Sequence, residues 1–126
     1  MPLTRIDLKR GKSPAYHRAI TENVYAAMRE TFNVPDGDRF MTVSEHDDDG
    51  FAFGADYLGI ARSGDLVLIQ ITCNATRTVA QKQALYRRIA ERLAESPGIR
   101  PEDVFINLVE VAKENWSFGN GIAQYA

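Results

Sequence analysis

The residue with the most distinctive potential chemistry is Pro2, which follows Met1 in the opening segment MPLTRIDL. If Met1 is removed, Pro2 becomes the N-terminal residue and carries a secondary amine in place of an amide nitrogen. A free α-amino group has a pKa of roughly 7.7 to 8.0, and burial or a neighbouring cation lowers that pKa. A neutral amine can act as a general base on a carbon acid, and a protonated one can act as a general acid or prepare an iminium. If Met1 is retained, that basicity is lost, and Pro2 simply begins an edge strand.

Two charged residues could complete a site around such an amine. Arg77 follows the apolar run 65–73 and precedes Thr78, so we expect it at a strand-to-helix junction, where ligands meet the positive end of a helix. Its guanidinium could bind a substrate carboxylate in two-pronged fashion, and the alternative is a solvated surface arginine. Asp38 could orient a water molecule or share protons with the amine. It could also be a turn or strand-start residue, because Asp103 takes the equivalent place later in the chain.

The sequence lacks the patterns of several other kinds of site. His17 and His46 do not have metal-ligand spacing with each other or with Cys73. The three aspartates at 47–49 lack the alternating ligands and the distal glutamate of a calcium-binding loop. There is no P-loop, no dinucleotide-binding glycine motif and no nucleophile elbow. We therefore expect neither a metal nor a cofactor.

The elements that must position these residues come from an internal repeat with an offset of 65 residues. The segment 38–45 (DRFMTVSE) matches 103–110 (DVFINLVE), with Asp, Phe and Glu in register. Further matched pairs are Leu3 and Leu68, Ile6 and Ile71, Ser13 and Thr78, Ile20 and Leu85, Val24 and Ile89, and Met28 and Leu93. Each half is typical of a strand, a helix and a second strand.

Local signals predict where the two helices begin and end. Ser13 is a favourable N-cap, and Pro14 suits the first helical position because an N–H there would have no partner. Thr78 begins a capping-box pattern at the start of the second helix. The segment 96–101 (SPGIRP) ends that helix and turns the chain into the last strand.

The strand pattern then predicts the fold class. Residues 3–8 alternate like a strand, and 65–73 form an apolar, β-branched run suited to a buried one. Two βαβ units with right-handed crossovers predict an α+β fold with a four-stranded sheet and both helices on one face. The other face needs cover, which oligomerisation would supply. Ferredoxin-like domains share this order of elements, so periodicity alone does not choose between the two architectures.

Length and composition indicate a single domain. We expect one domain over residues 1–126, with repeat halves of about 1–60 and 65–112 and an aromatic C-terminal tail at 113–126. Residues 45–57, between the halves, are polar and are expected to form an exposed loop.

The net charge and the hydropathy of the chain restrict the classes of partner and the cellular location that we expect. A net charge of −2 argues against nucleic-acid binding, and no apolar stretch approaches the length of a membrane span. Charged residues interrupt any signal-peptide core, and the single cysteine suits a reducing compartment, so we expect a cytoplasmic protein.

With these features in hand, the chain resembles the tautomerase superfamily, specifically its malonate semialdehyde decarboxylase-like branch. The resemblance covers nearly the whole length, and NWSFGNG is its most specific part. Its carriers are PLTRIDL (2–8), VPDGDRF (34–40), TRTVAQK (76–82), EDVFINLVE (102–110) and NWSFGNG (115–121).

The resemblance implies a homotrimer in which each subunit has an N-terminal proline in a pocket near a subunit boundary. Pro2 matches the catalytic amine, Asp38 matches an acidic residue that acts on water or on the proline's protonation, and Arg77 matches the carboxylate-binding arginine. The aromatic residues at the site are matched by Trp116, Phe118 and Tyr125.

One departure from the family bears on the substrate. The better-known decarboxylases of this branch carry two arginines one residue apart, whereas here Asn74, Ala75 and Thr76 precede Arg77, so only the second is present. A single arginine still suffices to hold the carboxylate of a 2-keto or enol acid. We therefore expect a cofactor-independent keto–enol tautomerase of small 2-keto and enol carboxylates, such as arylpyruvates.

Two alternatives stay open. The first is decarboxylation of malonate semialdehyde, a 3-oxo acid, or hydration of acetylenic acids with Asp38 positioning water. The second is a non-catalytic trimeric module in which Met1 is retained and the aromatic residues seal the oligomer.

Overall fold

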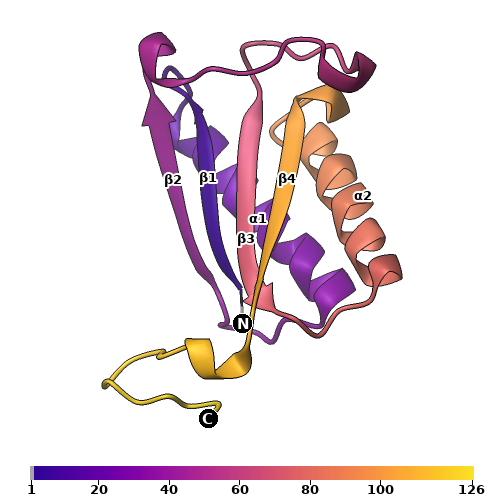
Figure 1. Cartoon of the computed structure of the whole chain (residues 1–126). Coiled ribbons are helices and arrows are strands. Elements are labelled where there is room, and N and C mark those ends of the chain that lie inside the picture. The colour runs from indigo at the N-terminus through magenta and orange to yellow at the C-terminus, as the bar shows by residue number, and fades with distance from the viewer. Residues whose placement is uncertain (1) are drawn as a thin grey trace.

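The chain forms two successive strand–helix–strand units. A computed structural model describes residues 2–126, and the question of whether Met1 is removed or retained concerns a residue outside the described ones. The helices and strands are β1 (Leu3–Lys9), α1 (Pro14–Phe32), β2 (Phe40–His46), β3 (Val67–Asn74), α2 (Val79–Glu95) and β4 (Val104–Val111). Short 3₁₀ turns are η1 (Asp48–Gly50), η2 (Tyr57–Gly59), η3 (Pro101–Asp103) and η4 (Lys113–Asn115). Figure 1 shows both helices on one face of the sheet, so the predicted α+β fold is confirmed.

The sheet places equivalent parts of the two halves at opposite ends. Its strand order is β2-β1-β3-β4; each half contributes a parallel pair, and β1 and β3 join the halves in antiparallel fashion. Leu3 pairs with Phe40 in the first half, and Leu68 pairs with Phe105 in the second. Because the central strands run in opposite directions, the beginning of β1 lies beside the end of β3.

Both helices begin as the sequence predicts. The Ser13 side chain accepts a hydrogen bond from the backbone N–H of Tyr16 at 3.1 Å. Thr78 and Gln81 form the reciprocal capping box, with distances of 3.2 Å and 2.9 Å. Each cap satisfies N–H groups that have no partner within the helix, which stabilises a helix end by about 0.5–2 kcal/mol. Helix α1 ends at Phe32, and the C-cap residue that follows it, Asn33, has a left-handed φ of 55°.

The hydrophobic core lies between the sheet and the two helices. Strand residues that point toward the helices are buried, and each fully buried aliphatic side chain contributes about 1.5–3 kcal/mol. The most deeply buried include Ile6, Ile69 and Ile71 from the sheet, Ile20, Val24 and Met28 from α1, and Leu85, Ile89 and Leu93 from α2. Within residues 2–126, no helix is long and apolar enough to cross a membrane.

The opposite sheet face carries polar side chains and several large apolar ones. Phe40 is 52% exposed, Phe105 47% and Val109 37%. Helices do not cover this face in the single chain, as Figure 1 shows. We call it the open sheet face.

The segment predicted as an exposed loop, 45–57, is only partly so. Glu45 and His46 belong to β2, and His46 Nε2 lies 2.7 Å from Asp7 Oδ1 on the neighbouring strand. Phe51 is buried, because its ring packs at 6.0 Å from the His46 ring and at 6.0 Å from the Phe53 ring. The expectation was wrong for these residues because tertiary packing outweighs the polar character of the segment.

Candidate active site

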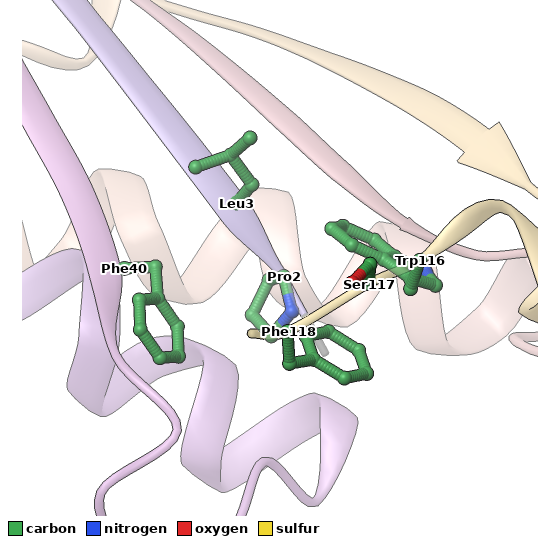
Figure 2. A pocket seen from close by; sticks show the side chains of 6 residues that line it. All are labelled: Pro2, Leu3, Phe40, Trp116, Ser117 and Phe118. Carbon is green, nitrogen blue, oxygen red and sulfur yellow. The ribbon is translucent and has the colours of Figure 1, made fainter. Parts of the chain in front are cut away.

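A small cavity lies where β1 begins, and Pro2 forms part of its wall. The cavity has a volume of about 190 Å³. Figure 2 shows Pro2 between Phe40 of β2 and the C-terminal segment that follows β4. The residues that line it are Pro2, Leu3, Phe40, Trp116, Ser117 and Phe118. Pro2 itself is buried, which sets it in a mostly apolar environment.

The C-terminal segment forms the aromatic side of this cavity. Trp116 and Phe118 stack with ring centroids 5.4 Å apart and an interplanar angle of 19°. Tyr125 meets the ring of Phe118 edge-on at 5.1 Å, so it supports Phe118 from outside the cavity. The Gln124 side chain holds the turn closed by accepting from the Phe118 N–H at 3.0 Å and donating to the Gly119 carbonyl at 3.0 Å. The three aromatic residues predicted for the site therefore form one cluster.

Asn74 anchors this aromatic cluster to the sheet. Trp116 Nε1 donates a hydrogen bond to Asn74 Oδ1 at 2.7 Å, and Asn74 is 7% exposed at the end of β3. In the sequence, Asn74 stands out only as one of the residues before Arg77, and no role for it was predicted. The signal that could have found it is a buried amide at the end of an apolar strand, which needs a hydrogen-bond partner.

Asp38 lies at the same end of the sheet and is buried, with an exposed fraction of 6%. Its backbone N–H donates to the Pro35 carbonyl at 3.2 Å in a turn where Gly37 has a φ of 84°. Burial raises the pKa of the Asp38 carboxyl, and the positive charge of Arg77 acts in the opposite direction. Asp38 is not among the residues that line the cavity.

Arg77 lies at the junction between β3 and α2, as predicted, and contacts the end of α1. Its Nη2 donates to the Phe32 carbonyl at 3.0 Å, and its guanidinium carbon lies 4.7 Å from the centroid of the Phe32 ring. Nη1 makes a longer hydrogen bond of 3.4 Å to Thr76 Oγ1. A guanidinium has five N–H donors, so these two contacts leave three for a ligand. Arg77 also lies outside the cavity lining.

The structure thus gathers the predicted residues at one end of the sheet but in two groups. Pro2, Trp116 and Phe118 share the cavity, whereas Asp38 precedes the beginning of β2 and Arg77 follows the end of β3, both outside the cavity lining. The electrostatic influence of Arg77 on the pKa of Asp38 links these two residues.

Comparison with known proteins places this chain in a family. The family described as "Tautomerase enzyme" matches residues 38–119. The probable tautomerase YusQ of Bacillus subtilis (strain 168) is 39% identical over 124 residues, which cover 98% of this chain and 98% of that protein. The chain belongs to the tautomerase family, and it is an enzyme of the tautomerase kind.

Solved structures indicate the branch. A malonate semialdehyde decarboxylase, described with decarboxylase and hydratase activities, is 33% identical with a TM-score of 0.92, over 98% of this chain and 95% of that one. The FG41 malonate semialdehyde decarboxylase, inhibited by 3-bromopropiolate, is 39% identical with a TM-score of 0.91, over 98% of this chain and 93% of that one. Within the tautomerase superfamily, the chain is a member of the malonate semialdehyde decarboxylase-like branch.

Proposed function

We propose that this chain is a cofactor-independent keto–enol tautomerase that converts small 2-keto and enol carboxylates through the amine of Pro2, after Met1 has been removed. The observation that carries the proposal is the burial of Pro2 in the wall of a cavity beside Trp116 and Phe118. An amine in such a place is poorly hydrated, which disfavours its charged form and lowers its pKa toward neutrality. Family membership supports tautomerase chemistry as the reaction class.

In the proposed reaction, Pro2 moves a proton between oxygen and carbon. In the direction of ketonisation, the neutral amine accepts the proton of the enol hydroxyl, which leaves an enolate and a protonated amine. The C2–O bond becomes a carbonyl as the electron pair of the C2–C3 double bond takes the proton from the protonated amine at C3. The amine is neutral again at the end, so no other acid or base is consumed. Such general acid–base catalysis contributes about 10²–10⁴-fold in rate.

Arg77 is proposed to hold the substrate carboxylate. Its contacts with Phe32 and Thr76 fix the guanidinium in place and leave three N–H donors. The adjacent N-terminus of α2, capped by Thr78, adds a favourable interaction with a negative charge. Trp116 and Phe118 exclude water from the reacting carbons, which strengthens electrostatic interactions inside the site.

Asp38 is proposed to adjust the protonation of Pro2. Burial raises the pKa of its carboxyl, so Asp38 keeps its proton to a higher pH than an exposed aspartate does and is proposed to exchange that proton with the amine. In a hydration reaction, the same carboxyl would instead orient the attacking water.

We also propose that the protein is a homotrimer, as the family resemblance implies. The open sheet face supports this, because Phe40, Phe105 and Val109 are large apolar side chains exposed in the single chain. Sedimentation velocity should give about three times the chain mass of 14.1 kDa. A species of one chain mass would contradict the trimer. The cytoplasmic location and the single domain over 1–126 stay predictions.

The second candidate function is decarboxylation of malonate semialdehyde or hydration of an acetylenic acid. It is favoured by the similarity to two malonate semialdehyde decarboxylases at 33% and 39% identity. One substrate panel separates the candidates: the enol of phenylpyruvate, malonate semialdehyde and an acetylenic acid, with enol absorbance and CO₂ release as readouts. The proposal predicts turnover of the enol at the highest kcat/KM. It is wrong if only CO₂ release or hydration is catalysed.

A further inference from the structure

The internal repeat extends beyond the strands into the segments that follow them. The turn η1 (48–50) and the turn η4 (113–115) correspond at the offset of 65 residues. The sequence that follows, FAFG at 51–54, corresponds to WSFG at 116–119. Figure 1 shows these two segments at opposite ends of the sheet. The C-terminal segment that walls the Pro2 cavity therefore has a counterpart at the other end of the molecule.

That counterpart also borders a cavity, which we call the second pocket. Its volume is about 390 Å³. The residues that line it are Ala52, Phe53, Gly54, Tyr57, Arg62, Leu66, Leu68 and Phe105. Phe53, Leu68 and Phe105 correspond through the repeat to Phe118, Leu3 and Phe40 of the first cavity. Three residues that line the second pocket therefore occupy positions equivalent to residues that line the first cavity.

The second pocket lacks the amine and the arginine that are proposed for catalysis at the first cavity. Val67 stands where the repeat has Pro2, and its nitrogen is an amide within the chain. Lys12 stands where the repeat has Arg77, and its Nζ forms an ion pair with Asp65 Oδ1 at 2.8 Å. The third counterpart, Asp103, is occupied by hydrogen bonds within the fold.

The hydrogen bonds of Asp103 show how fully it is occupied. Oδ1 accepts from the Ser63 backbone N–H at 2.7 Å, and Oδ2 accepts from the Ser63 hydroxyl at 2.6 Å and from Arg100 Nε at 3.2 Å. With no amine and with the Asp103 carboxylate engaged, the second pocket cannot perform the proton transfer proposed for Pro2.

Arg62 places a guanidinium in the lining of the second pocket. Its Nη1 donates to the Gly54 carbonyl at 3.1 Å and to the Tyr57 carbonyl at 3.0 Å. Among residues 2–126, no carboxylate forms an ion pair with Arg62, and its Nε and Nη2 donate no hydrogen bond. The ammonium of Lys9, which also pairs with Asp48, lies 5.7 Å from the Phe53 ring centroid and adds positive charge nearby.

We infer that the second pocket is a non-catalytic binding site for an amphipathic carboxylate, with the carboxylate on Arg62 and the apolar body against Phe53, Leu68 and Phe105. A guanidinium that lacks an acidic partner offers parallel N–H donors that match a carboxylate. The volume falls in the range of small-molecule pockets, and an aryl group is the body that aromatic walls favour. The inference does not rest on the proposed reaction, because it involves neither Pro2 nor turnover.

The test uses 3-phenylpropanoate, which has no keto group and cannot enolise. Equilibrium dialysis counts the sites per chain, while the fluorescence of Trp116, the single tryptophan, reports only the first cavity. We expect a site that leaves Trp116 fluorescence unchanged and that Arg62→Gln removes. The matched control, Arg18→Gln, changes an exposed arginine on α1 and should keep that site. If Arg62→Gln binds as many molecules per chain as the wild type, the inference is wrong.

A second variant keeps the test valid if Arg62→Gln loosens the loop that its Nη1 holds. Tyr57→Trp in a Trp116→Phe background places the single tryptophan in the wall of the second pocket, at a position that is 67% exposed and lies outside the open sheet face. Saturable change of its fluorescence with 3-phenylpropanoate is the expected result. Absence of any change up to saturation of the dialysis curve overturns the inference. Neither readout depends on turnover, so a failure here and a failure of the proposed tautomerase are distinguishable.

Discussion

Asp38 and Asp103 occupy equivalent positions in the two halves of the repeat, and the fold shifts their pKa values in opposite directions. Both are buried, at 6% and 1% exposure. Burial raises the pKa of Asp38. It acts in the same direction on Asp103, but the hydrogen bonds from Ser63 and Arg100 outweigh it and lower the pKa. Asp103 is therefore held as a stabilising carboxylate, whereas the charged form of Asp38 is disfavoured by its surroundings.

Replacing Asp103 by Asn should destabilise the protein at neutral pH. The variant loses the charge-assisted bonds with Ser63 and Arg100, which we expect to cost about 1–3 kcal/mol. A lowered pKa means that the stability contributed by the carboxylate is present above the unfolded-state pKa and is lost as pH falls through the folded-state pKa. Urea unfolding at neutral pH and at about pH 3 should therefore give a smaller difference in acid. An equal difference at both pH values would contradict this assignment.

Asp38→Asn should have the opposite effect on stability. A raised pKa means that the protonated carboxyl is the form that the fold tolerates, and its contribution is lost as pH rises through the folded-state pKa. The neutral amide imitates that form, so the variant should be more stable than the wild type at neutral pH, with a gain that vanishes in acid. Its kcat should fall, since Asp38 is proposed to adjust the protonation of Pro2. Thermal unfolding across pH and a pH–rate profile measure the two effects, and a less stable, fully active variant would refute both.

Asn74→Ala should disturb the aromatic wall without touching the proposed reacting groups. Loss of the 2.7 Å bond to Trp116 Nε1 should cost about 0.5–1.5 kcal/mol and leave the indole N–H to water. We expect a red shift of Trp116 fluorescence and a kcat/KM lower by about 3- to 10-fold, mainly through KM. Gln83→Ala, an amide deletion on the exposed face of α2, is the control and should change neither. Unshifted fluorescence in Asn74→Ala would show that Asn74 does not position Trp116.

Arg77→Lys should separate charge from geometry at the carboxylate site. A lysine keeps the positive charge but cannot form two parallel hydrogen bonds, so kcat/KM for a 2-keto acid should fall by about 10-fold or more. Turnover of the corresponding methyl ester, which has no carboxylate, should change far less. Equal losses on the acid and on the ester would mean that Arg77 acts on the fold, through its bond to the Phe32 carbonyl, and does not bind the carboxylate.

The parts of this structure that sequence could predict are those set by local patterns and by the repeat. Ser13 and Thr78 cap their helices because their hydroxyls reach N–H groups two or three residues away, a purely local relationship. The repeat predicted the paired strand–helix–strand units and hence the sheet. The same offset of 65 residues relates the segments after β2 and β4, which carry FAFG and WSFG. The sequence did not predict that each of these segments borders a cavity, and the structure shows that both do.

The other features of the site depend on contacts between residues far apart in the sequence, which the sequence alone did not predict. The bond between Asn74 and Trp116 joins residues 42 positions apart, and the contact of Arg77 with the Phe32 carbonyl spans 45. No periodicity encodes either one, because each depends on which strand ends lie side by side. Residue chemistry suggested roles for Pro2, Asp38 and Arg77, the family resemblance favoured those roles over the structural alternatives, and the roles stay predictions.

The central claim is that the Pro2 amine catalyses the reaction, and the most direct test is turnover of the phenylpyruvate enol by the wild type and Pro2→Ala. Intact mass first establishes that Met1 is absent from both proteins. The matched control is Pro14→Ala, which changes the exposed proline in the first turn of α1 and should retain wild-type kcat/KM. We expect Pro2→Ala to lower kcat by about 10²-fold or more. A Pro2→Ala variant with kcat within about twofold of the wild type, a barrier change below one RT, would contradict the central claim.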